Sequence, residues 1–167
     1  MMKLILIIAA IISLASCNRP NVIDISQEEE INIKENLINA NKYIAQSEET
    51  QIEHYISRRG WKMERLSCGA RVMETHQGNG ALIDYEDSIS VRCRIEALNG
   101  GVIYEELEES FVVGRHQTTV GLDAAVKKLR KGSKAIAIVP SEAAYGVGGD
   151  GDRINTRVVL IYHIEIL

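Results

Sequence analysis

Residues 139–149 read "VPSEAAYGVGG", and the glycine run continues as "YGVGGDGDRI" over residues 145–154. Gly146, Gly148 and Gly151 satisfy G-x-G-x-x-G, the pattern of dinucleotide-binding loops. That pattern requires a helix that begins at the glycines, within a βαβ unit of about 30 residues. Here the glycines lead into a segment with strand composition, "VVLIYHIEIL", and leave no crossover helix. We therefore interpret the run as a loop in which glycine lets the backbone pass close to another segment.

Metal binding is a second interpretation of the same run, because it contains Asp150 and Asp152. The run is not repeated and lacks a bidentate glutamate at loop position 12, so the pattern is weak evidence for calcium. The chain also has no C-x-x-C or H-x-x-x-H spacing, and its four histidines are scattered. The sequence predicts neither a metal nor a cofactor.

The segments around the run have strand character. Residues 88–97, "SISVRCRIEA", alternate strictly between apolar and polar side chains, as a half-buried strand does. An Asn-Gly turn follows within "LNGG". Residues 121–132, "GLDAAVKKLRKG", have the acidic start, basic end and closing glycine of a short helix. The other predicted strand segments are 64–75, 101–107, 110–114, 134–140 and 156–167. These elements predict an α+β fold, an antiparallel sheet of about five strands wrapped on one short helix.

A helical segment precedes the sheet. Residues 26–58 begin with Ser26 as a helix cap and three glutamates, and apolar residues then recur with a helical period. Arg58, Arg59 and Gly60 form a typical helix end. We expect one long helix or two shorter ones. The segment is either a spacer or a surface for homodimerisation.

The first residues have the features of an export signal. Lys3 precedes an apolar run from Leu4 to Ile12, which is shorter than the roughly 20 residues of a membrane span. The end of this segment, "LASC", resembles the lipobox of bacterial lipoproteins, in which the cysteine is lipidated; an ordinary cleavage site before a cysteine is the alternative. The sequence thus predicts a lipoprotein signal peptide over 1–16, a lipid-anchored tether and helix over 17–60 beginning at Cys17, and a main domain over 61–167.

Charge and cysteine content limit the partners. The formal net charge is −4, which argues against a nucleic-acid partner. Cys68 and Cys93 lie in separate predicted strands. Outside the cytoplasm they could form a disulfide, but two such cysteines are more often small buried hydrophobic residues.

The stretch 139–149 closely resembles the signature of FKBP-type peptidyl-prolyl isomerases, in which a strand ends in Ile-Pro and a Glu-Xaa-Ala-Tyr-Gly run follows. The segments "NGGVIYEE", "FVVGRHQTTVGLDAAVKKLRKGSKAIAIVP" and "VVLIYHIEIL" are similar to family segments in the same order. The resemblance covers residues 61–167 and implies the FKBP-like curved sheet. With the lipobox and the N-terminal helix, the layout looks most like the gliding-motility-associated FKBP-type lipoproteins.

The resemblance implies a peptidyl-prolyl cis-trans isomerase that acts on Xaa-Pro bonds of exported proteins and assists their folding. Such an enzyme needs a dry apolar pocket that suits the twisted amide, and no nucleophile or metal. Its substrates would be proline-containing polypeptides. Lipidated Cys17 would hold it in the cell envelope. Asn18 is not the aspartate that commonly retains lipoproteins in the inner membrane, which favours the outer membrane, facing the periplasm.

The resemblance also implies a set of pocket residues. Leu122 would be the floor, Phe111 and Tyr162 aromatic walls, Ile154 an apolar wall from the loop, and Tyr145 a hydroxyl donor to a substrate carbonyl. Substrate-binding positions would be Thr118 and Thr119, through backbone N–H, together with Ile103, Tyr104 and Cys93.

Three positions depart from the family pattern. Cys93 stands where the family has a tyrosine, Tyr104 where it has an aspartate, and Glu109 where it has an aromatic residue. These changes leave a second function open, an FKBP-like binding or chaperone module with little catalysis, possibly part of an envelope or gliding-motility machine. The neighbouring glutamates of residues 105–109 are expected to form a solvated face rather than an acid–base site.

Overall fold

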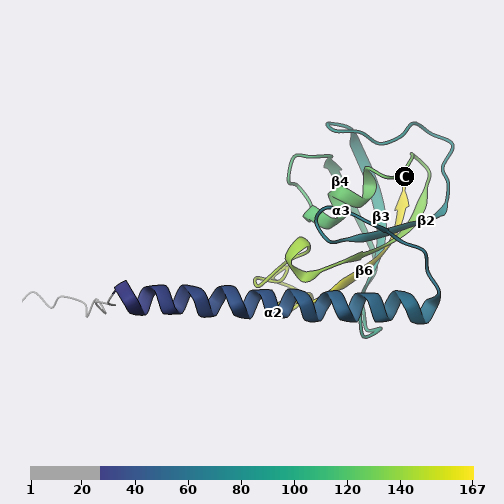
Figure 1. Ribbon diagram of the computed structural model, residues 1–167. Coiled ribbons are helices and arrows are strands. Elements are labelled where there is room, and N and C mark those ends of the chain that lie inside the picture. Colours follow the sequence, from purple (N-terminus) through teal and green to yellow (C-terminus); the bar gives the residue numbers. More distant parts are fainter. Residues whose placement is uncertain (1–26) are drawn as a thin grey trace, which may run out of the picture. The chain divides into compact units, whose positions relative to one another are not determined.

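The computed structural model describes residues 27–167. The predicted signal peptide, the lipidation of Cys17 and the cap at Ser26 lie outside these residues. Helix α2, Gln27–Arg59, is one continuous helix of 33 residues (Figure 1). Within the described part of the chain, no helix combines the length and the apolar character that crossing a membrane requires.

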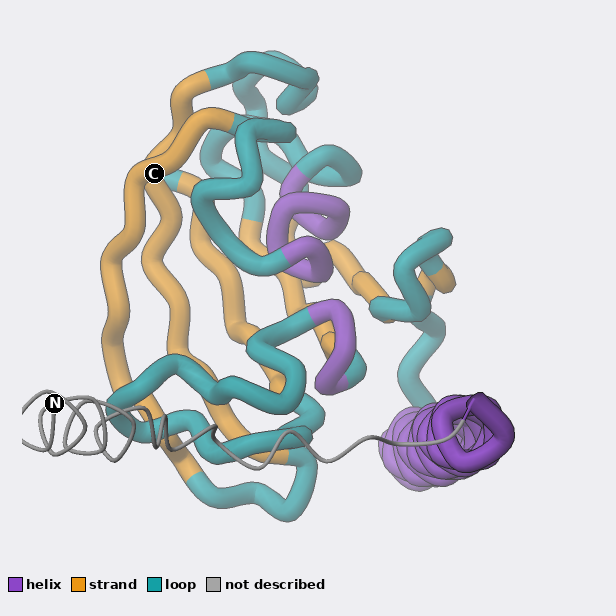
Figure 2. The backbone as a smooth tube through the Cα atoms, turned by 90° about the vertical axis from the view of Figure 1, so that its left-hand side faces the viewer, coloured by secondary structure: helices purple, strands orange, loops and turns teal. Residues whose placement is uncertain are grey.

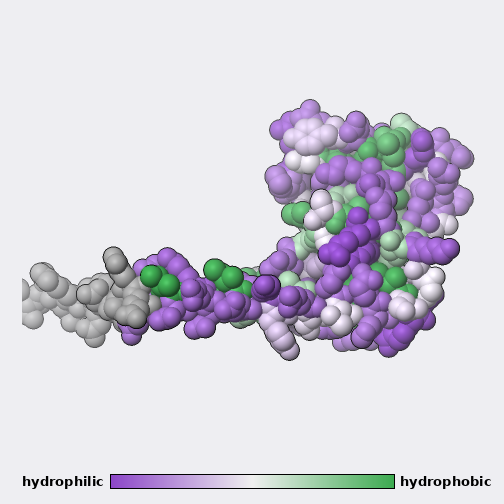
Figure 3. Space-filling model, in the orientation of Figure 1, coloured by the Kyte–Doolittle hydropathy of each residue, from purple (hydrophilic) through white to green (hydrophobic). Residues whose placement is uncertain are grey.

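The chain divides into two compact units after Asn39, inside α2. In the first unit, Lys34 Nζ lies 2.7 Å from Glu30 Oε1, one turn earlier. Figure 3 shows apolar surface on this part of the helix. Its exposed apolar residues are Ile31, Ile33, Leu37 and Ile38.

The second unit, Ala40–Leu167, contains one antiparallel sheet of six strands in the order β1-β2-β5-β6-β3-β4. The strands are β1 Glu64–Arg65, β2 Arg71–His76, β3 Ser88–Ala97, β4 Val102–Val112, β5 Lys134–Val139 and β6 Leu160–Ile166. The α+β prediction is confirmed, with six strands where about five were expected. The segments 101–107 and 110–114, predicted separately, form the single strand β4, because Glu108 and Glu109 continue the pairing with β3. Glu105 and Glu106 lie at a register shift within the same strand.

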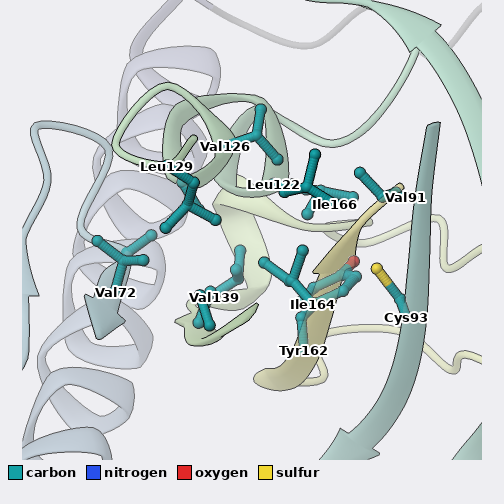
Figure 4. Close-up of a cluster of buried hydrophobic side chains, with 14 of the residues drawn as sticks. Val72, Val91, Cys93, Leu122, Val126, Leu129, Val139, Tyr162, Ile164 and Ile166 are labelled. Carbon is teal, nitrogen blue, oxygen red and sulfur yellow. The ribbon is translucent and has the colours of Figure 1, made fainter. Parts of the chain in front are cut away.

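Two short helices lie on one face of the curved sheet, α3 Val120–Val126 and the 3₁₀ helix η1 Ser141–Ala143 (Figure 2). Leu122 and Val126 of α3 pack on inward side chains of β3, β5 and β6 (Figure 4). Gly121 permits this close approach, since a Cβ there would lie 2.2 Å from Val139 Cγ1. The main core therefore lies between α3 and the sheet.

Helix α3 is shorter than the predicted helix over 121–132. After Val126 the backbone N–H groups of Lys128 and Leu129 bond to carbonyls three residues earlier, at 3.1 and 2.9 Å. This tighter turn directs Leu129 into the core, where it is 1% exposed. Arg130 then forms an isolated bridge with Leu82, which ends any helical continuation.

The second half of α2 packs against the sheet. Ile52 and Tyr55 are buried with Ile138, Val159 and Ile161. Ile138 lies between Ala137 and Val139, which belong to the α3 core, so by strand alternation this second cluster is on the opposite face. The sheet is thus covered on both faces, and α2 from Ala40 onward shares its compact unit.

Candidate functional site

A cavity of about 480 Å³ opens between β4, the loop before α3 and the segment after η1. Its walls mix polar and aromatic side chains. They are Glu109, Ser110, Phe111, His116, Gln117, Thr118, Thr119, Ala144 and Tyr145. Four of the predicted site residues therefore line one cavity, although they come from segments up to 34 residues apart, between Phe111 and Tyr145.

The other predicted pocket residues lie beneath or beside this cavity. Leu122, Tyr162 and Ile154 are buried, with 1%, 2% and 4% of their surface exposed. They belong to one hydrophobic cluster with Phe111. Ile103 and Tyr104, both partly buried, pack against the same cluster. The floor below the cavity is therefore apolar and closed to water.

Tyr145 is positioned by a tight turn. It follows η1, in which Ala144 N bonds to Ser141 O at 3.1 Å, and Gly146 N bonds back to Ser141 O at 2.8 Å. Half-burial, together with the negative charge of Glu109, raises the pKa of the Tyr145 hydroxyl. The hydroxyl therefore stays protonated at neutral pH and is available as a hydrogen-bond donor.

Sequence reasoning missed the residue that anchors this turn. Glu48 of α2 is 7% exposed, and its carboxylate accepts from Ser141 N at 2.9 Å and from Ser141 Oγ at 2.5 Å. Glu48, Ile52 and Tyr55 are spaced four and three residues apart, so they share one helix face. A glutamate on the same helix face as two buried apolar residues could have predicted that α2 packs against a hydrogen-bond donor.

The glycine-rich loop after Tyr145 is organised by Asp150. Its carboxylate accepts from Ile154 N at 2.8 Å, Asp152 N at 2.9 Å and Tyr104 Oη at 2.6 Å. Gly149 has φ +68°, and a Cβ there would lie 2.3 Å from Ile154 O. The glycines thus allow a close turn that closes onto β4.

The hydrogen bond between Tyr104 and Asp150 shifts the pKa values of both side chains. The hydrogen bond to the carboxylate raises the pKa of Tyr104 to about 12. Desolvation opposes ionisation of Asp150, but the hydrogen bonds from Tyr104 and the loop backbone outweigh it and lower the pKa of Asp150. Tyr104 therefore holds the loop with a phenol at a position where the family pattern has a carboxylate. Among residues 27–167, no three His, Cys, Asp or Glu side chains are arranged to hold a metal.

The two other departures lie close to the cavity. Cys93 is 2% exposed, and burial with the nearby charge of Glu109 raises the pKa of its thiol to about 12. Glu109 lines the cavity, and its Oε2 accepts from Thr118 Oγ1 at 3.3 Å. Cys68 and Cys93 are both free thiols.

In the chain from residue 18, we expect Cys68 to be alkylated by iodoacetamide at pH 8 and Cys93 to be protected. Thiolate is the reacting form, and Cys93 is both buried and held protonated. The rates are measured by mass spectrometry of tryptic peptides, with the urea-unfolded chain as the control for equal intrinsic reactivity. Equal rates in the folded chain would contradict the buried position of Cys93.

The fold and the cavity together define a class: a curved antiparallel sheet closed on a short helix, with a cavity of polar and aromatic walls above an apolar floor. Residues 81–167 match the family model of FKBP-type peptidyl-prolyl cis-trans isomerases. The chain belongs to this family.

Curated relatives agree with the family. The chain is 27% identical over 105 residues to the probable FKBP-type 25 kDa peptidyl-prolyl cis-trans isomerase of Pseudomonas aeruginosa, covering 63% of this chain and 46% of that protein. It is 32% identical over 89 residues to FK506-binding protein 5 of Dictyostelium discoideum, covering 53% and 5%. The chain thus spans less than half the length of either relative.

Solved structures show the same fold. A peptidyl-prolyl cis-trans isomerase from Pseudomonas syringae pv. tomato superposes with a TM-score of 0.62 at 23% identity, over 75% of this chain and 92% of that one. The N-terminal domain of FKBP42 from Arabidopsis thaliana superposes with a TM-score of 0.57 at 20% identity, over 64% and 90%.

Proposed function

We propose that the protein is a peptidyl-prolyl cis-trans isomerase whose site is the cavity between Phe111, Thr119 and Tyr145. One observation carries the proposal: three segments of the chain place an aromatic wall, a helix-cap threonine and a protonated tyrosine around one opening above a closed apolar floor. The family membership of residues 81–167 supports the same activity.

The geometry suits a reaction that breaks no covalent bond. Rotation about a peptide bond has a barrier of about 18–20 kcal/mol, because twisting the amide removes its resonance. A proline ring against Phe111 would leave water, and an environment poor in water favours the less polar twisted amide over the planar one. Tyr145 Oη would donate to a substrate carbonyl, and the backbone N–H of Thr119 would hold the chain in register. These contacts orient the substrate and need no ionised group.

The proposal also covers the substrates, the cellular location and the self-association of the protein. We infer substrates among exported proteins and a place in the cell envelope, because residues 1–17 have the pattern of a lipoprotein signal ending in Cys17. The outer membrane, facing the periplasm, and a role in gliding motility follow from the same resemblance. The exposed apolar residues of α2 near Leu37 support contact with a second copy of the chain through residues 26–58.

A binding or chaperone module with little catalysis is the second candidate. The observation that favours it is the changed pocket, with Glu109 in the wall and a thiol at Cys93. Both candidates predict binding of a polypeptide. Turnover of Xaa-Pro peptides distinguishes them, and so does binding of unfolded polypeptide that does not depend on proline.

Tyr145→Phe is expected to reduce kcat/KM for a short Xaa-Pro peptide by about 2- to 15-fold, the effect of losing one hydrogen bond. The measurement is exchange NMR of the peptide with the soluble chain from residue 18. Tyr43→Phe, which removes a hydroxyl from an exposed position on α2, is the matched control and should leave the rate unchanged. A folded wild-type chain that leaves the peptide at its uncatalysed rate would overturn the enzyme proposal and leave the binding module.

A further inference from the structure

Glu109 is a charged group that the free protein leaves without a counter-ion. Its carboxylate is partly buried in the cavity wall and accepts one hydrogen bond, from Thr118 Oγ1 at 3.3 Å. No Lys, Arg or His side chain within residues 27–167 forms an ion pair with it. The other glutamates of β4 differ. Glu105, Glu106 and Glu108 pair with Arg94 or Arg92, at 2.6 to 3.0 Å.

The charge of Glu109 acts on the interior of the site. Burial is the largest cause of the raised pKa values of Tyr145, Tyr162 and the Cys93 thiol. The charge of Glu109 is the next cause for Tyr145 and Cys93, and the smallest for Tyr162. The inner end of the cavity therefore has a negative potential. A carboxylate that loses water on ligand binding without gaining a cation is costly, so the site favours ligands that bring one.

A second polar group, the Tyr162 hydroxyl, lies beneath the cavity. Tyr162 Oη is buried. It makes no hydrogen bond of ordinary geometry with the described residues, but the side chains of Thr119 and Tyr145 lie close enough to interact with it weakly. Figure 4 shows the Tyr162 and Cys93 side chains directed toward one another from β6 and β3. An ammonium group has three donors, and the Glu109 carboxylate and the Tyr145 phenol oxygen, both in the cavity wall, offer acceptors to it.

We propose that the site selects proline-containing polypeptides in which lysine or arginine directly precedes the proline. This inference rests on the proposed function of the same cavity. A basic side chain would pair with Glu109, whereas leucine at this position would leave the carboxylate desolvated and glutamate would face a like charge. The specificity therefore has an attractive and a repulsive component.

The test compares four peptides, Ala-Xaa-Pro-Phe with lysine, arginine, leucine or glutamate as Xaa, by exchange NMR with the full chain. We expect kcat/KM for the basic peptides to exceed that for leucine by about tenfold, and that for glutamate to be lowest. The preference should shrink when NaCl is raised from 0.05 to 0.5 M, because salt screens the partly exposed pair.

Glu109→Gln is expected to bring the lysine-to-leucine ratio close to one. Glu108→Gln is the matched control, since it removes the same charge from the same strand at a residue that pairs with Arg92 on the solvated face, and it should retain the ratio. Glu109→Lys should reverse the order and favour the glutamate peptide, which tests the pairing even if the glutamine variant folds poorly.

Equal rates for all four peptides with the wild-type chain would overturn the inference and leave the isomerase proposal standing. Absence of turnover for every peptide would instead remove the proposed activity. The same peptides are then compared by NMR titration: tighter binding of the basic peptides supports the inference for a binding module, and equal affinities overturn it.

Discussion

Ile52→Ala is expected to lower the free energy of unfolding by about 2–5 kcal/mol, the range for truncating a fully buried isoleucine. Ile52 is 0% exposed and packs against Ile138, Val159 and Ile161, on the face of the sheet opposite α3. Removing three carbons there leaves a cavity between two rigid elements, the helix and the sheet, which cannot close over it.

The measurement is urea denaturation followed by circular dichroism. The matched control is Ile38→Ala in the same helix, at a residue that is 64% exposed, which should change stability by less than about 0.5 kcal/mol. A small effect at both positions would show that α2 is not part of the folded core. With the expected result, the fragment 61–167 should be much less stable than the fragment 40–167.

Glu48→Ala is expected to cost about 2–4 kcal/mol of stability and to reduce turnover as well. The carboxylate is the partner of Ser141 N and Ser141 Oγ, and each buried group left unpaired costs about 1–3 kcal/mol. Ser141 O also receives the N–H of Gly146 at 2.8 Å, so releasing Ser141 loosens the turn that carries Tyr145. Glu48 is thus a positioning residue, acting through Ser141.

A double-mutant cycle with Ser141→Ala isolates this interaction. Stability and kcat/KM are measured for both single variants and the double variant, with Glu35→Ala, at an exposed position of α2, as the control. We expect the double variant to be less damaged than the sum of the single ones. Strict additivity in both quantities would show that the two residues act independently.

The local alternation of apolar and polar residues predicted much of the fold. Strict alternation identified β3 with the bounds 88–97 that the structure has, because one face of that strand is buried along its whole length. The same rules divided β4, since they treat charged residues as strand breakers, and the pairing with β3 overrides them. They also extended α3 through its lysines, because the tight turn after Val126 depends on Leu129 reaching the core.

The site residues that belong to contiguous sequence motifs were predictable. Tyr145 and the Thr118–Thr119 segment were found from the family pattern, and the structure places them in one cavity with Phe111. Glu48 was not found, since its partner is 93 residues away and no periodicity links a helix face to a distant turn. Asp150 was considered for calcium, and its partners are instead Tyr104 and the loop backbone.

The outer edge of the sheet has a consequence for how the protein behaves at high concentration. Strand β4 is eleven residues long and is the last strand of the sheet, so its outer backbone groups could template a further strand. Four glutamates, at 105, 106, 108 and 109, lie on this edge strand, and charged side chains on an edge disfavour pairing with another chain. The charged edge therefore opposes edge-to-edge aggregation when the protein is concentrated.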